Sequence, residues 1–444
     1  MKTRVLCLLV TLALSSPAVS PAQTLDECLA LARAHAPKLE AADAAVARAE
    51  FAIHEARAAL SPTLRLGASF TQLSEEQRIA FQLPGSPASQ AIKTGSASAL
   101  DIRTDFQYPL TTGGRDPALV RAAEAARAAQ SHNREQARAD LTLRVSQAFY
   151  HALAAQRLQA AAREAISSAV AHRATSAARV RAGVVPRLDS LQAQVDVATR
   201  GAAVVRANEA VRLARVALET EIGAALDTSR ALVEPGSPSE PFPDPAASIE
   251  RAMRARPELA AADEGLRENQ ARLEAARAGH RPQVNLSATA QYLGPNRNEE
   301  YWNTDDPGLK TYRLFAAVGL TMPLFDGGLV RAREGEVASD RIALSARRED
   351  TRLAIRREVE QALSDARVAV NVWQSDSSRV AAAREALRIA EAGYKGGTVN
   401  GTDVRDAESA LADARAEEAQ SLMDYWTARA AIDHAIGATT KKEN

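Results

Sequence analysis

The segment PLTTGGR at residues 109–115 returns as PLFDGG at residues 323–328, which is 214 positions further along the chain. Other glycines, prolines and an aspartate recur in the same order, at an offset of 214 or 220. These pairs are Pro37 and Pro257, Pro62 and Pro282, Gly183 and Gly397, Asp189 and Asp403, and Gly223 and Gly437. One segment alone differs in length between the copies, so the sequence predicts two structural repeats with the same order of elements.

Each copy contains two stretches in which apolar and polar residues alternate. They are residues 63–73 and 100–110 in the first copy and 283–293 and 312–322 in the second. A period of two is typical of a strand with one apolar and one wet face. The polar segment 74–99, rich in Gly, Ser and Pro, and residues 294–311, which include Tyr301 and Trp302, are expected to be loops. Aromatic residues gather in these regions, as they do at the interfaces of membrane barrels.

Very long helices are expected after each pair of strands. Residues 118–181 contain neither Gly nor Pro, and residues 329–391 are interrupted by Gly335 alone. A helix of about 65 residues is about 100 Å long. In the second copy, apolar residues recur every seven positions, at Val359, Ala366, Trp373, Val380, Leu387 and Tyr394. This spacing predicts a coiled-coil seam, and Gly183 and Gly397 predict the turns of two helical hairpins.

The beginning of the chain has the pattern of a secretory signal. Lys2 and Arg4 precede an apolar run, and small residues follow it, so we expect cleavage after Ala22; the alternative is a frayed helix. The remaining organisation is a first repeat at 23–223 with its turn at 182–188, a proline-rich linker at 224–247, a second repeat at 248–437 with its turn at 396–402, and a tail at 438–444.

Composition excludes several classes of function. Lys and Arg together number 55 and so do Asp and Glu, so no basic excess points to nucleic acid. Of the two cysteines, Cys7 lies in the signal and Cys28 is left alone, which excludes an internal disulfide and a cysteine metal site. The seven histidines lack a metal-ligand spacing, and no catalytic constellation is present. We therefore expect no enzyme activity, no metal and no cofactor.

Four strands per chain are too few to close a barrel. Apart from the expected signal, no stretch reaches the ~20 apolar residues of a membrane helix, so the mature chain can enter a bilayer only with strands. Open sheet edges cannot face lipid, because their N–H and C=O groups would be unsatisfied. Edges of several chains must then meet, and three chains would give a barrel of twelve strands.

The sequence resembles the TolC-type outer-membrane factors, also called outer membrane efflux proteins, over essentially the whole mature chain. The motifs that carry the resemblance are the two turns at 182–189 and 392–404 and the strand-to-helix junctions at 109–115 and 323–328. The resemblance implies a mainly α, mixed fold: long antiparallel helical hairpins form a periplasmic α-barrel, and four strands per chain contribute to a trimeric 12-stranded transmembrane β-barrel. It places the homotrimer in the lipid of the outer membrane of a Gram-negative bacterium.

In function, the family implies a passive exit duct of a tripartite efflux pump or of type I secretion. Its partners would be a periplasmic adaptor protein and an inner-membrane transporter. The rival interpretation is a trimeric coiled-coil structural protein, similar to an adhesin, with no transport role. The duplicated strand pairs argue against this structural protein, because a coiled-coil stalk does not require two β-hairpins at equivalent points of its sequence.

The resemblance also implies a periplasmic gate. Asp403 and Asp406 match acidic rings that narrow the entrance, and Tyr394 matches a gate tyrosine whose acidic hydrogen-bond partner is matched by Asp189. The alternative role for Asp403 is to cap its helix, and both roles can hold. This chain departs from the family where Val399 replaces a basic gate residue and Arg405 an aliphatic one.

The turns themselves match the surface that contacts the adaptor. The residues expected there are Gly183, Val184, Val185, Leu188, Gly397, Thr398 and Val399. Loop geometry is the alternative explanation of the glycines.

Overall fold

The computed structural model describes residues 22–75, 78–82, 89–93, 98–227, 230–236, 242–294 and 312–438. The expected signal peptide up to residue 21, Tyr301 with Trp302, and residues 439–444 of the tail lie outside these ranges. The chain forms two compact units. A sheet unit contains residues 41–136 and 257–354, and a hairpin unit contains the segments up to residue 40, 137–256 and from 355 onward.

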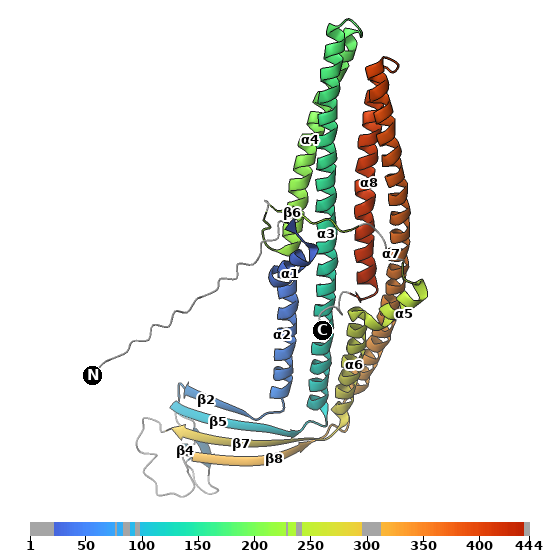
Figure 1. Cartoon of the computed structure of the whole chain (residues 1–444). Coiled ribbons are helices and arrows are strands. Elements are labelled where there is room, and N and C mark those ends of the chain that lie inside the picture. The colour runs from blue at the N-terminus through green and yellow to red at the C-terminus, as the bar shows by residue number, and fades with distance from the viewer. Residues whose placement is uncertain are drawn as a thin grey trace, which may run out of the picture. The chain divides into compact units, whose positions relative to one another are not determined.

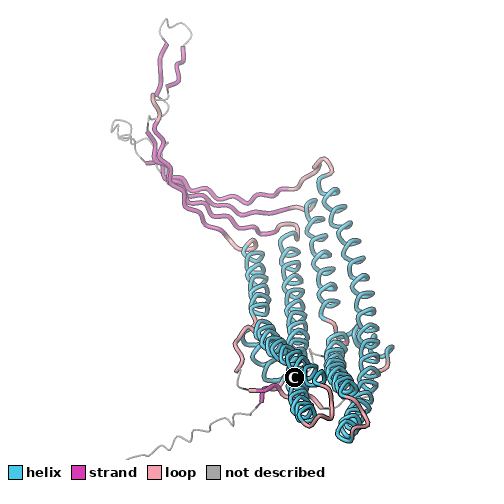
Figure 2. The backbone as a smooth tube through the Cα atoms, turned by 90° about the horizontal axis from the view of Figure 1, so that it is seen from above, coloured by secondary structure: helices cyan, strands magenta, loops and turns pink. Residues whose placement is uncertain are grey.

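Four antiparallel strands make the main sheet of the sheet unit (Figures 1 and 2). They are β2 (Thr63–Gln72), β5 (Ser98–Thr111), β7 (Gln283–Gly294) and β8 (Tyr312–Thr321). Each begins and ends within two residues of the alternating stretch in the sequence. The order β2-β5-β7-β8 joins the two repeats through β5 and β7, so β2 and β8 are the edges of this sheet.

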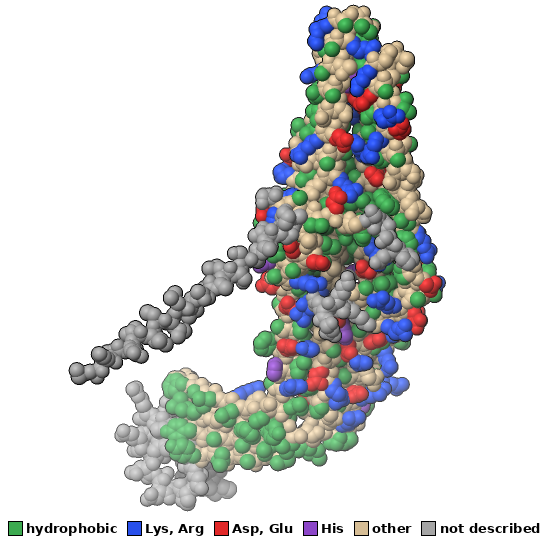
Figure 3. Space-filling view, in the orientation of Figure 1, with side chains coloured by type: hydrophobic (Ala, Val, Ile, Leu, Met, Phe, Trp, Pro, Cys, Tyr) green, Lys and Arg blue, Asp and Glu red, His purple; other side chains and the backbone are tan. Residues whose placement is uncertain are grey.

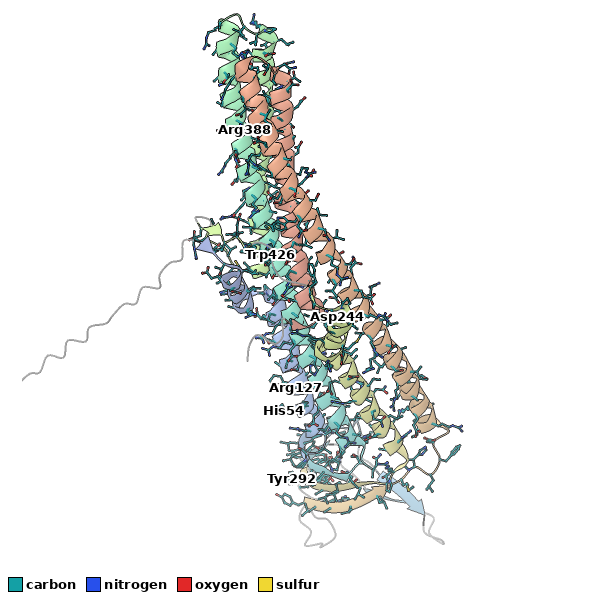
Figure 4. All side chains as sticks on the ribbon, turned by 45° about the vertical axis from the view of Figure 1, so that its right-hand side comes forward. His54, Arg127, Asp244, Tyr292, Arg388 and Trp426 are labelled. Atoms are coloured by element: carbon teal, nitrogen blue, oxygen red, sulfur yellow. The ribbon has the colours of Figure 1, made fainter. Side chains whose placement is uncertain are left out.

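The register of these strands separates two faces. Leu66, Thr104, Ala290 and Leu314 form one row across the sheet, and the rows beside it on the same face are largely aliphatic or aromatic. Hydrophobic side chains cover this part of the molecule in Figure 3. On this face Tyr292 (labelled in Figure 4) and Tyr312 have ring centroids 5.1 Å apart.

The other face of the sheet is polar and hydrogen-bonded. Thr289 Oγ1 donates to Asp105 Oδ1 over 2.7 Å, and Gln291 Nε2 donates to Asp101 Oδ1 over 2.9 Å. Arg103 forms an ion pair with Asp101 at 3.5 Å. The sheet is therefore apolar on one face and polar on the other. The exposed Phe315 is an exception, because it lies on the polar face in the same row as Asp105.

The segment expected to be a loop at 74–99 contains further strands, so that expectation was wrong in part. Strands β3 (Arg78–Gln82) and β4 (Ser89–Lys93) pair antiparallel in a sheet of their own. Most residues of this segment are polar or small, so the prediction overlooked Ile79, Phe81 and Ile92, which are residue types that favour strands.

Helices continue from the sheet strands. They are α2 (Pro37–Ala58), α6 (Pro257–Arg277), the short 3-10 helix η1 (Ala278–His280), and the first parts of α3 (Arg115–Arg181) and α7 (Leu329–Gly396). The two glycines before α3 have φ values of 65° and 88°, and the two before α7 have 65° and 89°. The repeated sequence motif thus builds the same left-handed junction twice, a conformation that favours glycine.

The hairpin unit contains the rest of the long helices and a small core. Its other elements are α1 (Leu25–His35), α4 (Arg187–Ile222), α5 (Pro245–Ala255), α8 (Gly401–Ala435), and the parallel pair β1 (Ala22–Gln23) and β6 (Ala231–Leu232). The core contains Cys28 of α1, Phe149 and Leu153 of α3, Ile222 of α4 and Met423 of α8. In α7 the expected seam is buried at Val359, Ala366, Val380 and Tyr394.

A charged cluster fixes the helices beside this core. His434 of α8 lies between Asp140 of α3 and Glu358 of α7. Arg256, the C-cap of α5, donates from both terminal nitrogens to the two oxygens of Glu358, over 3.0 and 2.8 Å. In the described part of the chain, no helix is both long and apolar enough to span a membrane.

Candidate functional site

The turns of the two helical hairpins share one backbone conformation. Gly183 has a φ of 69° and Gly397 a φ of 79°. Val184 N donates to Arg179 O over 3.0 Å, and Thr398 N donates to the equivalent Gly393 O over 2.9 Å. These bonds satisfy carbonyl groups at the ends of α3 and α7 in the pattern typical of a glycine helix stop. Loop geometry therefore explains both glycines, and the side chains around them differ.

Asp403 caps its own helix. The backbone N–H of Asp403 donates to Asn400 Oδ1 over 2.9 Å, and the N–H of Asn400 donates to Asp403 Oδ2 over 3.3 Å. This is a reciprocal capping box. Asp403 and Asp406 are both exposed and lie three residues apart on α8, so both carboxylates remain available to solvent.

Asp189 occupies a different position in the first hairpin. Its helix, α4, begins after Pro186, whose side chain has no polar atom and makes no capping hydrogen bond. The Asp189 carboxylate instead lies against Gly401, where a β-carbon would be 3.0 Å from Oδ2. The same β-carbon would be 3.6 Å from Cε2 of Tyr394. The structure thus brings Asp189 and Tyr394 to the same small residue of α8.

Tyr394 does not make the hydrogen bond expected from the family pattern. Its side chain is buried, and its hydroxyl oxygen has no hydrogen-bond partner among the described residues. The Arg179 guanidinium lies over its ring, with Cζ 4.4 Å from the ring centroid, and Nη1 donates to the Tyr394 carbonyl oxygen. The expected hydrogen bond between Tyr394 and Asp189 is therefore replaced by a contact with Arg179.

Arg405 connects the hairpins by a second route. Its Nη1 donates to Gln192 Oε1 of α4 over 2.9 Å, and its Nη2 donates to Thr402 Oγ1 over 3.1 Å. The side chain is half-buried between α8 and α4, while Asp403 and Asp406 lie in the same turns of α8 and are exposed.

A buried acid and a buried histidine lie behind these tips. Glu408 of α8 and His172 of α3 are both buried, and both line a cavity of about 150 Å³ with Glu391, Tyr394 and Lys395. Burial and the nearby Asp196 raise the pKa of Glu408 to about 7, although Arg200 and Arg405 oppose the shift. Burial, followed by the charge of Arg405, lowers the pKa of His172.

Sequence reasoning did not identify Arg179, His172 or Glu408. A signal for Glu408 was present, because it falls four residues after Val404 on a seam that continues with Leu411. A charged residue at a seam position is unusual and marks a special environment. His172 was grouped with the scattered histidines. Within the described ranges, no three His, Cys, Asp or Glu side chains are placed to hold a metal ion.

Comparison with known proteins assigns the family. The model of the outer membrane efflux protein family matches residues 28–224 and 248–438. The chain therefore belongs to the outer membrane efflux protein family. Membership confirms the predicted TolC-like fold and the predicted class, an outer-membrane channel for transport, and favours it over the structural stalk.

Individual relatives are distant. The chain is 23% identical to outer membrane protein TolC of Salmonella enteritidis over 170 residues, which are 37% of this chain and 34% of that protein. It is 25% identical to the cobalt-zinc-cadmium resistance protein CzcC of Cupriavidus metallidurans over 344 residues, or 75% and 76% of the two chains. The match to TolC thus spans about a third of that relative.

A solved structure shows the same fold over nearly the whole chain. The outer membrane protein VceC of Vibrio cholerae superposes with a TM-score of 0.75 at 21% identity, covering 93% of this chain and 96% of that one. A likeness at this level of identity shows the fold alone.

Proposed function

We propose that this chain is one subunit of a homotrimeric outer-membrane duct, through which a tripartite efflux pump releases its cargo. The main support is the sheet, which has one apolar face, one polar face and two open edges. Leu66 and Leu314 on its apolar face are 76% and 83% exposed in a single chain. Leucine side chains exposed in this way are favourable when they contact lipid. The opposite, polar face of the sheet then lines a water-filled lumen.

The two edge strands of the sheet need hydrogen-bond partners, which other copies of the same chain can supply. Strand β2 has free backbone groups on one edge and β8 on the other. In hydrocarbon these groups need partners, so β2 of one copy pairs with β8 of the next. Three copies close a ring of twelve strands, which is within the range of outer-membrane barrels.

The helices of the hairpin unit support the same assembly. Helix α4 exposes an apolar series along its length: Leu188, Leu191, Val195, Val205, Leu213 and Val216. Helix α7 exposes Val368, Val372 and Ile389. In the trimer, α4 of one copy packs against α7 of its neighbour, because coiled-coil contacts cover apolar residues at this spacing.

Asp403 and Asp406 form the gate of this duct in our proposal. Three copies place six carboxylates around the periplasmic entrance, where their combined field attracts cations. The capping role of Asp403 is compatible with this, because its carboxylate is exposed.

The hairpin turns are the proposed contact for a periplasmic adaptor, which connects the duct to an inner-membrane transporter. Val184 and Leu188 are 62% and 60% exposed at the first tip. Apolar side chains exposed at the end of a long hairpin provide a surface on which a helical partner can pack.

Channel recording tests the gate directly. The variant with both Asp403→Asn and Asp406→Asn removes the charges but keeps an oxygen acceptor for the capping box. In planar bilayers the wild-type trimer should show a small resting conductance, and the double variant a larger one with less preference for cations. Asp413→Ala, at an exposed acid further along α8, is the control. Equal conductance in wild type and double variant would contradict the gate.

The cargo is tested in cells. A strain that lacks the gene should become more sensitive to toxic compounds, and the panel should include cobalt, zinc and cadmium because CzcC is a resistance protein for these metals. Unchanged sensitivity together with retention of a secreted protein inside the cell would favour type I secretion.

A further inference from the structure

Arg179 joins the two hairpin tips within one chain. It lies in the last turn of α3, and its guanidinium covers the ring of Tyr394 near the end of α7. The same group donates from Nη1 to the Tyr394 carbonyl oxygen. The contact also approaches the second turn, where a β-carbon at Gly397 would be 3.8 Å from Nη2 of Arg179.

The chemistry of this contact requires arginine. A planar guanidinium can stack on an aromatic face and donate in its own plane at the same time, whereas a lysine ammonium is a compact charge that cannot do both. The Tyr394 carbonyl is one of the last in α7, which is the negative end of the helix dipole. A cation at this point is therefore favoured by the ring, by the carbonyl and by the helix end.

Tyr394 does not form the hydrogen bond to Asp189 that the family pattern predicts across the tips. Its hydroxyl has no hydrogen-bond partner among the described residues, and Asp189 lies against Gly401 instead. Val399 stands where the family has a basic gate residue, and a valine side chain can form neither an ion pair nor a hydrogen bond. Arg405 donates to Gln192 and Thr402.

We propose that Arg179 holds the tip of the α7–α8 hairpin against the tip of the α3–α4 hairpin, as a positioning residue that keeps Tyr394 in place when the duct is closed. This inference rests on the proposed function and specifies how the gate is kept shut. The ring and the backbone carbonyl of Tyr394 are the groups that Arg179 binds, and the hydroxyl is dispensable.

The first test is a set of charge variants recorded as trimers in planar bilayers. Arg179→Gln should increase the ratio of open to closed channels by roughly 3- to 10-fold, which is the effect of losing a partly desolvated cation–π contact. Arg179→Lys keeps the charge and should give an intermediate ratio. Arg181→Gln, at the exposed arginine two residues further on, should behave as wild type.

The second test separates the ring of Tyr394 from its hydroxyl. Tyr394→Phe keeps the surface on which Arg179 stacks and should leave the resting conductance unchanged. Tyr394→Leu removes the aromatic face and should raise the conductance about as much as Arg179→Gln does. A gate held by a tyrosine–aspartate hydrogen bond would give the opposite result, with Tyr394→Phe as open as Tyr394→Leu.

The outcomes distinguish this inference from the proposed function. Suppose that Arg179→Gln has the conductance of wild type while the Asp403→Asn, Asp406→Asn variant has a larger one. The proposed function as a duct is then supported, but Arg179 does not hold the hairpin tips together. If Tyr394→Phe opens the channel, the inference is also overturned. If the wild-type trimer and all variants form no channel, both the proposed function and the inference fail. The thermal unfolding temperature of each variant should stay within a few degrees of wild type, so that an opened gate is not confused with a misfolded chain.

Discussion

Nδ1 of His434 in α8 lies 3.0 Å from Oε1 of Glu358 in α7. The other ring nitrogen lies 2.9 Å from Oδ1 of Asp140 in α3. Two acceptors, one at each nitrogen, require both nitrogens to donate, so the ring is an imidazolium. Burial opposes this charge, but the hydrogen bonds to Asp140 and Glu358 outweigh it and raise the pKa of His434 to about 9.

This pKa predicts how stability depends on pH. The folded-state pKa of His434 is above its ordinary value of 6.5, so its contribution is fully present below pH 6.5 and is lost as the pH rises through about 9. His434→Gln should destabilise the protein by about 1.5–3 kcal/mol at neutral pH, the range for hydrogen bonds to charged groups. Thermal unfolding in detergent should show the gap between variant and wild type narrowing at pH 10; a constant gap would contradict the charged state.

Glu408 should make the hairpin tips more stable in mild acid. Its pKa is raised to about 7, so its contribution is present below pH 4.5 and is lost as the pH rises through about 7. The titratable and charged groups that face it are His172 from α3, Asp196 and Arg200 from α4, Glu391 from α7 and Arg405 from its own helix.

The matched variant is Glu408→Gln, which cannot ionise. The unfolding temperature of wild type should fall by a few degrees between pH 5 and pH 8, and that of Glu408→Gln should fall less. At pH 8 the variant should be at least as stable as wild type. A larger fall in the variant than in wild type would show that the Glu408 carboxylate is favoured in the folded chain.

Much of the fold was predictable from the sequence because its signals are periodic. Alternation located the four strands of the main sheet, and the absence of Gly and Pro located the long helices. The strands β3 and β4 were missed because each is only five residues long and lies within a polar segment. A short strand gives too few alternations to stand out from its surroundings.

The site was less predictable than the fold. The resemblance identified Asp189, Tyr394, Asp403 and Asp406 as candidates, but the partner of Tyr394 is set by how α3 and α7 pack. Arg179 and Tyr394 are 215 residues apart in the chain, and nothing local relates them. The cap made by Asn400 and Asp403, by contrast, depends on residues three apart, and the expectation that Asp403 caps its helix is confirmed.

The two faces of the sheet predict opposite effects of neighbouring substitutions. Leu314→Arg places a charge on the apolar face of β8, two residues from the strand end at Tyr312, and should cost up to about 2–4 kcal/mol per chain, a penalty that is largest at the bilayer middle and smaller toward its interfaces. It should strongly reduce the amount of assembled protein in outer-membrane fractions. Arg313→Gln, on the polar face at the adjacent residue, is the control and should assemble normally. Equal assembly of both variants would contradict a lipid-facing surface.

Adjacent glycines in the second turn make a matched pair for stability. Gly397 has a φ of 79°, and alanine there should cost about 1–2 kcal/mol, the penalty for a β-carbon in the left-handed region. Gly396 is helical with open space around its Cα, so alanine there should be neutral or stabilising by about 0.4–1 kcal/mol. Chemical unfolding of the two variants measures the difference, and the reverse order would contradict the turn conformation.

A closed pore requires three copies of this chain to complete one wall. Native mass spectrometry of the protein extracted from outer membranes measures this most directly. We expect a complex of three identical chains that persists in mild detergent. A folded single chain of the same protein, stable in water and absent from the membrane fraction, would contradict the trimeric duct.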